Sequence, residues 1–86
     1  MMQKEFTIAN PLGIHSRPAG EVMKKAKSFP CDVFITKVEK RINAKSIIGV
    51  LALEMGCGDK VIVETNGERE QEALDEVGAM LESVLE

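Results

Sequence analysis

Residues 4–29, KEFTIANPLGIHSRPAGEVMKKAKSF, change from strand-like to helix-like spacing, which indicates a fold that contains both strands and helices. Apolar and polar residues alternate over 4–8, which predicts a strand. Residues 10–13, NPLG, predict a loop, because proline blocks strand pairing and glycine tolerates unusual dihedral angles. Apolar residues then recur at helical intervals. They predict a helix over 16–28, with a proline in its first turn and Pro30 just beyond its end.

The same two periodicities predict the remaining elements. β-Branched residues predict strands at 33–35 and 60–65, and Ile42 marks a further short strand. Helical spacing predicts a short helix over 46–53 and a final amphipathic helix over 69–85. The order is therefore strand, helix, strand, strand, helix, strand, helix. This order indicates an α+β sandwich in which helices cover one face of a mostly antiparallel sheet.

Two local features of these elements are also predicted. Residues 38–41, VEKR, lack the Asn-Gly signal of a tight hairpin, so a residue there must adopt a less favoured turn conformation. The final helix presents one apolar face at intervals of three and four residues. That face consists of Ala73, Leu74, Val77, Leu81 and Val84.

Length and charge limit the function. A chain of 86 residues fits one domain, which we expect to span 1–86. Residues 1–45 contain nine Lys/Arg and four Asp/Glu, whereas residues 46–86 contain two and ten. The first half therefore offers a basic surface to an acidic partner. The net charge of −3 and the absence of Trp and Tyr argue against nucleic-acid binding.

The sequence has no features of a membrane span, a signal peptide or a cysteine-based metal site, and this limits the compartment and the cofactors to be expected. No apolar run approaches the ~20 residues of a membrane span, and the N-terminus predicts a strand rather than a signal peptide. We therefore expect a cytoplasmic protein without a membrane partner. Cys31 and Cys57 have neither CxxC spacing nor a companion His pair. Free, partly buried thiols are expected, and neither a metal nor another cofactor is implied.

His15, the only histidine, lies between a glycine-containing loop and the predicted start of a helix. The simplest interpretation is a surface or capping histidine. However, the first turn of a helix offers free N–H groups to an anion, and Arg17 is a strong donor to phosphate oxygens. Gly13 lets the backbone bend so that the ring stands clear of it. A nucleophile beside an anion pocket, with no carboxylate nearby in sequence to position a water, suggests reversible phosphoryl carriage rather than turnover.

Two motifs resemble one known family. Residues 10–19, NPLGIHSRPA, resemble the active-site signature of the histidine-containing phosphocarrier (HPr) family of the bacterial sugar phosphotransferase system. Residues 43–51, NAKSIIGVL, resemble the second motif of that family, around its regulatory serine. The chain length and the order of the elements also agree, so the resemblance covers nearly the whole chain.

The resemblance implies a carrier that does not turn over alone. Enzyme I, charged from phosphoenolpyruvate, would phosphorylate His15 on its δ nitrogen, and sugar-specific IIA domains would receive the phosphoryl group. Arg17 would stabilise the phosphate. The supporting loop would consist of Gly13, Ser16 and Pro18. The family fold is an open-faced sandwich of a four-stranded antiparallel sheet and three helices, and we expect a monomer.

Ser46 is predicted to be the N-cap of the short helix, and a cap alone would explain a serine there. The resemblance implies a second role as a regulatory phosphosite. The partners would then be a serine kinase/phosphorylase and a catabolite-control transcription factor. An alternative is therefore a regulatory paralogue that acts mainly through phosphorylated Ser46. A second alternative is a small binding module in which His15 only caps a helix.

The short helix over 46–53 is too apolar for a helix that needs one buried stripe. Val50 and Leu53 fall together on a helical wheel, so we expect them in the core. The other apolar residues of this helix either join the core or form an exposed patch for partners, and we favour the patch. These residues are Ile47, Ile48 and Leu51. Lys24 and Lys27, in the first helix, would border the same docking surface for acidic partners.

Leu12 departs from the pattern of the family. Many members have a polar side chain at this position, able to bond the phosphate or to cap the first helix. A leucine offers no hydrogen bond. The phosphate contacts are therefore expected to come from backbone N–H groups and from Arg17.

Overall fold

A computed structural model describes residues 1–84, in which seven elements follow one another in the predicted order. The strands are β1 (Met2–Thr7), β2 (Asp32–Lys37), β3 (Lys40–Asn43) and β4 (Lys60–Asn66). The helices are α1 (Ser16–Lys27), α2 (Ile47–Ala52) and α3 (Glu70–Leu81). Most predicted boundaries lie within two residues of the observed ones, because the spacing of apolar residues changes sharply at each element.

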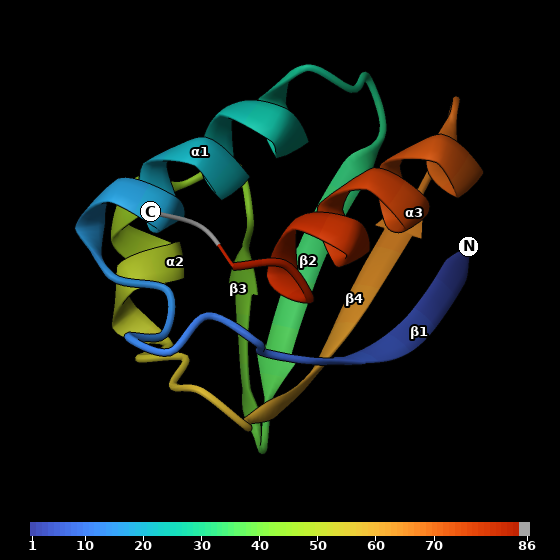
Figure 1. Cartoon of the computed structure of the whole chain (residues 1–86). Helices are drawn as coiled ribbons and strands as arrows, with labels where there is room; N and C mark the ends of the chain where they lie inside the picture. Colours follow the sequence, from blue (N-terminus) through green and yellow to red (C-terminus); the bar gives the residue numbers. More distant parts are fainter. Residues whose placement is uncertain (85–86) are drawn as a thin grey trace.

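The strands form one antiparallel sheet in the order β1-β4-β2-β3, so β4 lies between the first and second strands of the chain. Alternate residues of β4, Val61, Val63 and Thr65, are buried on one face. The three helices cover this face, and the other face of the sheet is left open (Figure 1). The predicted α+β sandwich, with its four-stranded antiparallel sheet and three helices, is confirmed.

The core lies between the sheet and the helices. Helix α1 buries Ala19, Val22 and Ala26 against it. Helix α3 approaches β1 so closely that a Cβ atom added at Gly78 would overlap the ring of Phe6. The close packing of α3 therefore depends on a residue without a side chain at this point.

The end of α3 differs from the prediction. The helix ends at Leu81, with Glu82 as its C-cap, whereas the sequence predicted a helix to residue 85, which lies outside the described residues. Val84 was predicted to join the apolar face, but it is exposed. The last turn has no basic residue, and an acidic residue follows it, which is unfavourable at the negative end of a helix dipole.

The turn between β2 and β3 adopts the strained conformation that the sequence predicted. Val38 has a φ of 58°, in the left-handed region that a β-branched residue rarely adopts. The pairing of Lys37 with Lys40 leaves two residues for the turn, and neither is glycine or asparagine. The predicted unfavourable turn conformation is therefore confirmed, and Val38 is the residue that adopts it.

Candidate functional site

His15 is the N-cap residue of α1, yet its side chain makes no capping hydrogen bond. Its backbone is extended, with φ −83° and ψ −168°, and its carbonyl oxygen accepts a hydrogen bond from the N–H of Ala19 at 2.8 Å. The backbone thus begins the helix, and the imidazole is exposed. The interpretation of His15 as a residue whose ring serves only to cap the helix is not supported by this geometry.

A tight turn precedes His15. The N–H of Gly13 donates to the carbonyl oxygen of Asn10 at 2.8 Å, and the side-chain amide of Asn10 donates to the carbonyl oxygen of Gly13 at 2.7 Å. The Asn10 side chain is buried, so these bonds are shielded from water. Pro11 and Leu12 occupy the centre of the turn, and the backbone before His15 is therefore held in one conformation.

Backbone contacts with residues 54–59 fix this turn to the body of the molecule. Ile14 donates its N–H to the carbonyl oxygen of Met55 at 2.8 Å. Gly13 has a φ of 72°, and a Cβ atom there would overlap the same carbonyl oxygen. Glycine is thus required at position 13 both by the left-handed backbone and by the close approach of a second segment.

An ion pair between Lys37 and Asp59 holds residues 54–59 in place. The ammonium of Lys37 donates to the carbonyl oxygen of Glu54 at 2.7 Å and lies 2.9 Å from a carboxylate oxygen of Asp59. The same carboxylate oxygen accepts the N–H of Gly56 at 2.7 Å. The hydrogen bond from Lys37, followed by that from Gly56, holds the pKa of the Asp59 carboxyl below its usual value. The end of β2 thereby supports the segment on which the His15 loop rests.

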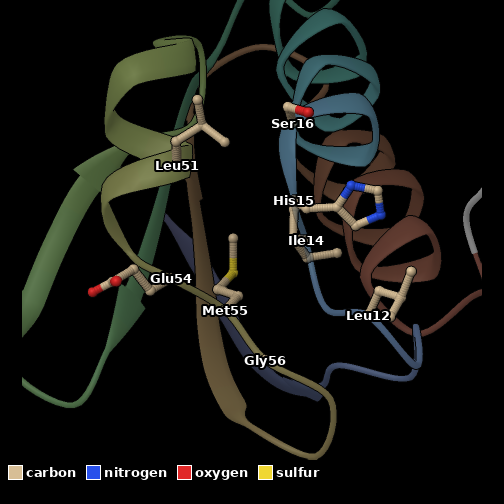
Figure 2. Close-up of a pocket in the computed structure, with 8 residues that line it drawn as sticks. All are labelled: Leu12, Ile14, His15, Ser16, Leu51, Glu54, Met55 and Gly56. Carbon is tan, nitrogen blue, oxygen red and sulfur yellow. The ribbon is translucent and has the colours of Figure 1, made fainter.

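His15 borders an open pocket of about 410 Å³. The pocket is lined by Leu12, Ile14, His15, Ser16, Leu51, Glu54, Met55 and Gly56. Figure 2 shows Leu12 and His15 on one side and Leu51 and Glu54 on the other, with the Glu54 side chain pointing away from His15. Sequence reasoning missed Glu54 and Met55, because no local motif indicates that residues forty positions away meet the histidine loop.

Donors for an anion lie at the start of α1. The backbone N–H groups of Ser16 and Arg17 have no carbonyl partner within residues 1–84. Pro18 is buried and has no N–H to offer, and its fixed φ suits the first turn of a helix. The Arg17 side chain is exposed, and the first turn contains no acidic residue. An anion beside His15 would therefore meet two N–H groups at the positive end of the helix.

Helix α2 forms the other side of the site, and one prediction for it was wrong. Val50 and Leu53 are buried, as expected. Ile48 is 77% exposed and Leu51 is 40% exposed, so the structure places both on the surface, as predicted. Ile47 was predicted to be exposed, but it is half-buried and packs against the core. The first residue of so short a helix still faces the body of the molecule, which the helical wheel did not show.

Ser46 is the N-cap of α2, as predicted. Its hydroxyl oxygen accepts the N–H of Gly49 at 3.2 Å, and its own N–H donates to the carbonyl oxygen of Asn43 at 3.0 Å. The backbone of Ser46 is extended, with φ −108° and ψ 119°. The side chain is exposed, so a hydroxyl that caps the helix also remains accessible at its surface.

Lys24 and Lys27 are exposed on the last turn of α1. At 1.5 Å per residue, Lys27 lies about 18 Å along the helix from His15. Both cations also interact favourably with the negative end of the helix dipole. The structure therefore places the two lysines on the same helix as the His15 site but at its opposite end.

Both thiols are free, as predicted, but only one of them is exposed. Cys31 is buried in the core and Cys57 lies on the surface.

Among residues 1–84, no group of three or more His, Cys, Asp or Glu side chains is placed to hold a metal ion. No helix in this part of the chain is long and apolar enough to cross a membrane.

Comparisons with known proteins identify the family that the chain resembles. A family model for the PTS HPr component phosphorylation site matches residues 2–83. The phosphocarrier protein HPr of Cupriavidus necator is 38% identical over 81 residues, 94% of this chain and 91% of that protein. The HPr-like protein Crh of Bacillus subtilis is 37% identical over 82 residues, 95% of this chain and 96% of that protein.

A solved structure shows the same fold. The crystal structure of HPr from Bacillus anthracis superposes with a TM-score of 0.90 at 35% identity, and the match covers 93% of this chain and 95% of that one. HPr proteins are phosphocarriers rather than enzymes. Sequence, fold and relatives agree, and this chain belongs to the HPr family of phosphocarrier proteins.

Proposed function

We propose that the chain is a single phosphocarrier domain in which His15 accepts a phosphoryl group from phosphorylated enzyme I and passes it to sugar-specific IIA domains. The observation that carries the proposal is the exposed imidazole of His15, which makes no capping bond and lies beside unused N–H groups at the start of α1. Membership of the HPr family supports the same role.

The transfer step follows from this arrangement. The δ nitrogen of His15 attacks the phosphorus of the phosphoryl group carried by the donor. A bond forms between that nitrogen and phosphorus while the donor's bond to phosphorus breaks, and the donor atom keeps the electron pair. The N–H groups of Ser16 and Arg17 and the Arg17 guanidinium then stabilise the phosphate oxygens. Transfer to an acceptor is the same step in reverse.

The proposal is tested with phosphoenolpyruvate and enzyme I. The chain should gain the mass of one phosphoryl group, and acid should remove it. His15→Ala should abolish the gain and leave the fold unchanged, because the ring is exposed. Arg17→Ala should slow the transfer without preventing it, since the backbone donors remain. Acid-labile phosphorylation of the His15→Ala variant would contradict the assignment.

We propose further that Ser46 is a regulatory phosphosite for an ATP-dependent serine kinase. A phosphate on its hydroxyl would gain from the N–H groups of the first turn of α2, so the fold should tolerate it. The added negative charge would lie beside Ile48 and Leu51, the patch proposed to meet enzyme I. Docking should therefore weaken through charge repulsion and through desolvation of the phosphate.

The variant Ser46→Asp tests this regulation. It should stay folded and should accept phosphate from enzyme I more slowly than the wild-type chain, with a difference that shrinks at high salt because charges are screened. Ser46→Ala removes the cap without adding charge and serves as the control. A wild-type rate for Ser46→Asp at both low and high salt would reduce Ser46 to a helix cap.

The second candidate function is a regulatory paralogue that acts mainly through phosphorylated Ser46, together with a catabolite-control transcription factor. The similarity to the HPr-like protein Crh favours this candidate. The presence of His15 and Arg17 favours the carrier. Incubation with phosphoenolpyruvate and enzyme I separates the two candidate functions, because only the carrier gains an acid-labile phosphoryl group.

A further inference from the structure

We propose that Leu12 is a partner-binding residue, which forms a second apolar border of the His15 pocket and is covered by an apolar side chain of the phosphoryl donor. The inference rests on the proposed function and names a determinant of donor recognition at the same site.

The exposure of Leu12 is the first observation. Its side chain is 80% exposed, so its packing within the molecule is slight. It nevertheless occupies the centre of a turn whose hydrogen bonds, 2.8 Å and 2.7 Å long, join Asn10 to Gly13. A hydrogen bond from the N–H of Ile14 to the carbonyl oxygen of Met55 fixes this turn to the rest of the molecule. A large apolar side chain is therefore displayed on a rigid backbone, and a partner that binds it does not have to order the loop.

The position of Leu12 is the second observation. Leu12 lines the same pocket as His15, on the side opposite Leu51 (Figure 2). Phosphoryl transfer requires reacting atoms to approach within about 3–3.5 Å, so a donor that reaches His15 comes close to the residues that line this pocket. Leu12 and the exposed Leu51 of α2 offer that donor apolar surface on two opposite sides of the pocket.

The chemistry of the partner follows from the apolar character of Leu12. Leu12 has neither a donor nor an acceptor in its side chain, so a polar group placed over it would lose hydrogen bonds to water without replacement. An apolar side chain over Leu12 would instead remove apolar surface from water on both proteins. Water would also be excluded from the phosphoryl group during its transfer.

The experiment measures initial rates of phosphorylation by enzyme I as the concentration of the carrier is varied. Leu12→Ser should raise KM about tenfold with little change in kcat, since one exposed leucine side chain is lost from the interface. Leu12→Met should recover most of the lost affinity, because its side chain is of similar size and polarity. Ile62→Ser removes a similar apolar side chain from the open face of the sheet and should leave KM unchanged.

Two further measurements distinguish the possible failures. An unchanged KM for Leu12→Ser would overturn the inference. A longer lifetime of the isolated phosphohistidine in that variant would then show that the side chain at position 12 affects the stability of the phosphohistidine and not docking. If the wild-type chain is not phosphorylated, the proposed function fails. Calorimetric binding to enzyme I then tests Leu12 independently: an affinity weakened in Leu12→Ser but not in Ile62→Ser supports the docking role, and equal affinities exclude it.

Discussion

Replacing Gly13 with alanine tests how firmly the His15 loop is held. Gly13 has a φ of 72°, and the left-handed conformation costs an L-residue about 1–2 kcal/mol. The added Cβ atom would also overlap the carbonyl oxygen of Met55, so the loop must move away from that segment. The hydrogen bond from Ile14 to Met55 is then lost, at a net cost of about 1 kcal/mol. We expect Gly13→Ala to reduce the free energy of unfolding by about 2–3 kcal/mol.

A second glycine in a left-handed conformation separates strain from overlap. Gly58 has a φ of 89°, and a Cβ atom there meets no atom within 4 Å. Gly58→Ala should therefore cost only the backbone strain, about 1–2 kcal/mol. Urea denaturation of the two variants gives the comparison. The rate of His15 phosphorylation should also fall about a hundredfold in Gly13→Ala, because a displacement of about 1 Å in a reacting group has an effect of this size.

An equal loss of the free energy of unfolding in the two alanine variants would contradict this prediction. The close approach of residues 55–56 would then contribute nothing to the loop. A Gly13→Ala variant that is the less stable of the two but is phosphorylated at the wild-type rate would also contradict it. In that case the contact would stabilise the fold without positioning His15.

Three further predictions concern packing, pH and docking. Gly78→Ala should destabilise the protein by about 1–3 kcal/mol in urea denaturation, because the new methyl group overlaps Phe6; an unchanged midpoint would show that α3 shifts freely. Because the pKa of Asp59 is lowered, its bond to Lys37 stabilises the folded state at pH values above the ordinary aspartate pKa. This stabilisation is lost as the pH falls through the lowered pKa of Asp59. The stability difference between the wild-type chain and Asp59→Asn should therefore be constant near pH 7 and shrink below about pH 4, and a constant difference at every pH would exclude the ion pair as its cause. Ile48→Asp should weaken the binding of enzyme I in calorimetry without lowering stability, whereas unchanged binding would remove α2 from the docking surface.

The fold was predictable from the sequence because its elements are locally encoded. Alternation in 4–8 and helical spacing in 16–28 report the burial of successive side chains directly. The end of α3 was less predictable, since Val84 continues the apolar spacing beyond the point at which the helix stops. The turn between β2 and β3 was predicted to be unfavourable, but the sequence did not show that Val38 would adopt the positive φ.

The candidate site was predictable only in its local part. His15 and Arg17 adjoin each other in sequence, so one motif indicated both. Met55 was missed because its contact with Ile14 is a backbone hydrogen bond between distant segments, which leaves no signature in side-chain type. The burial of Ile47 was also missed, because a wheel for one isolated helix omits the elements packed around it.

Transfer from the isolated phosphorylated chain tests most directly the claim that His15 carries a phosphoryl group reversibly. The chain is phosphorylated with enzyme I, separated from it, and mixed with a IIA domain, and the masses of both proteins are followed. We predict that the IIA domain gains the phosphoryl group, that the chain returns to its original mass, and that little inorganic phosphate appears. Release of the phosphate to water without phosphorylation of the IIA domain would contradict the account.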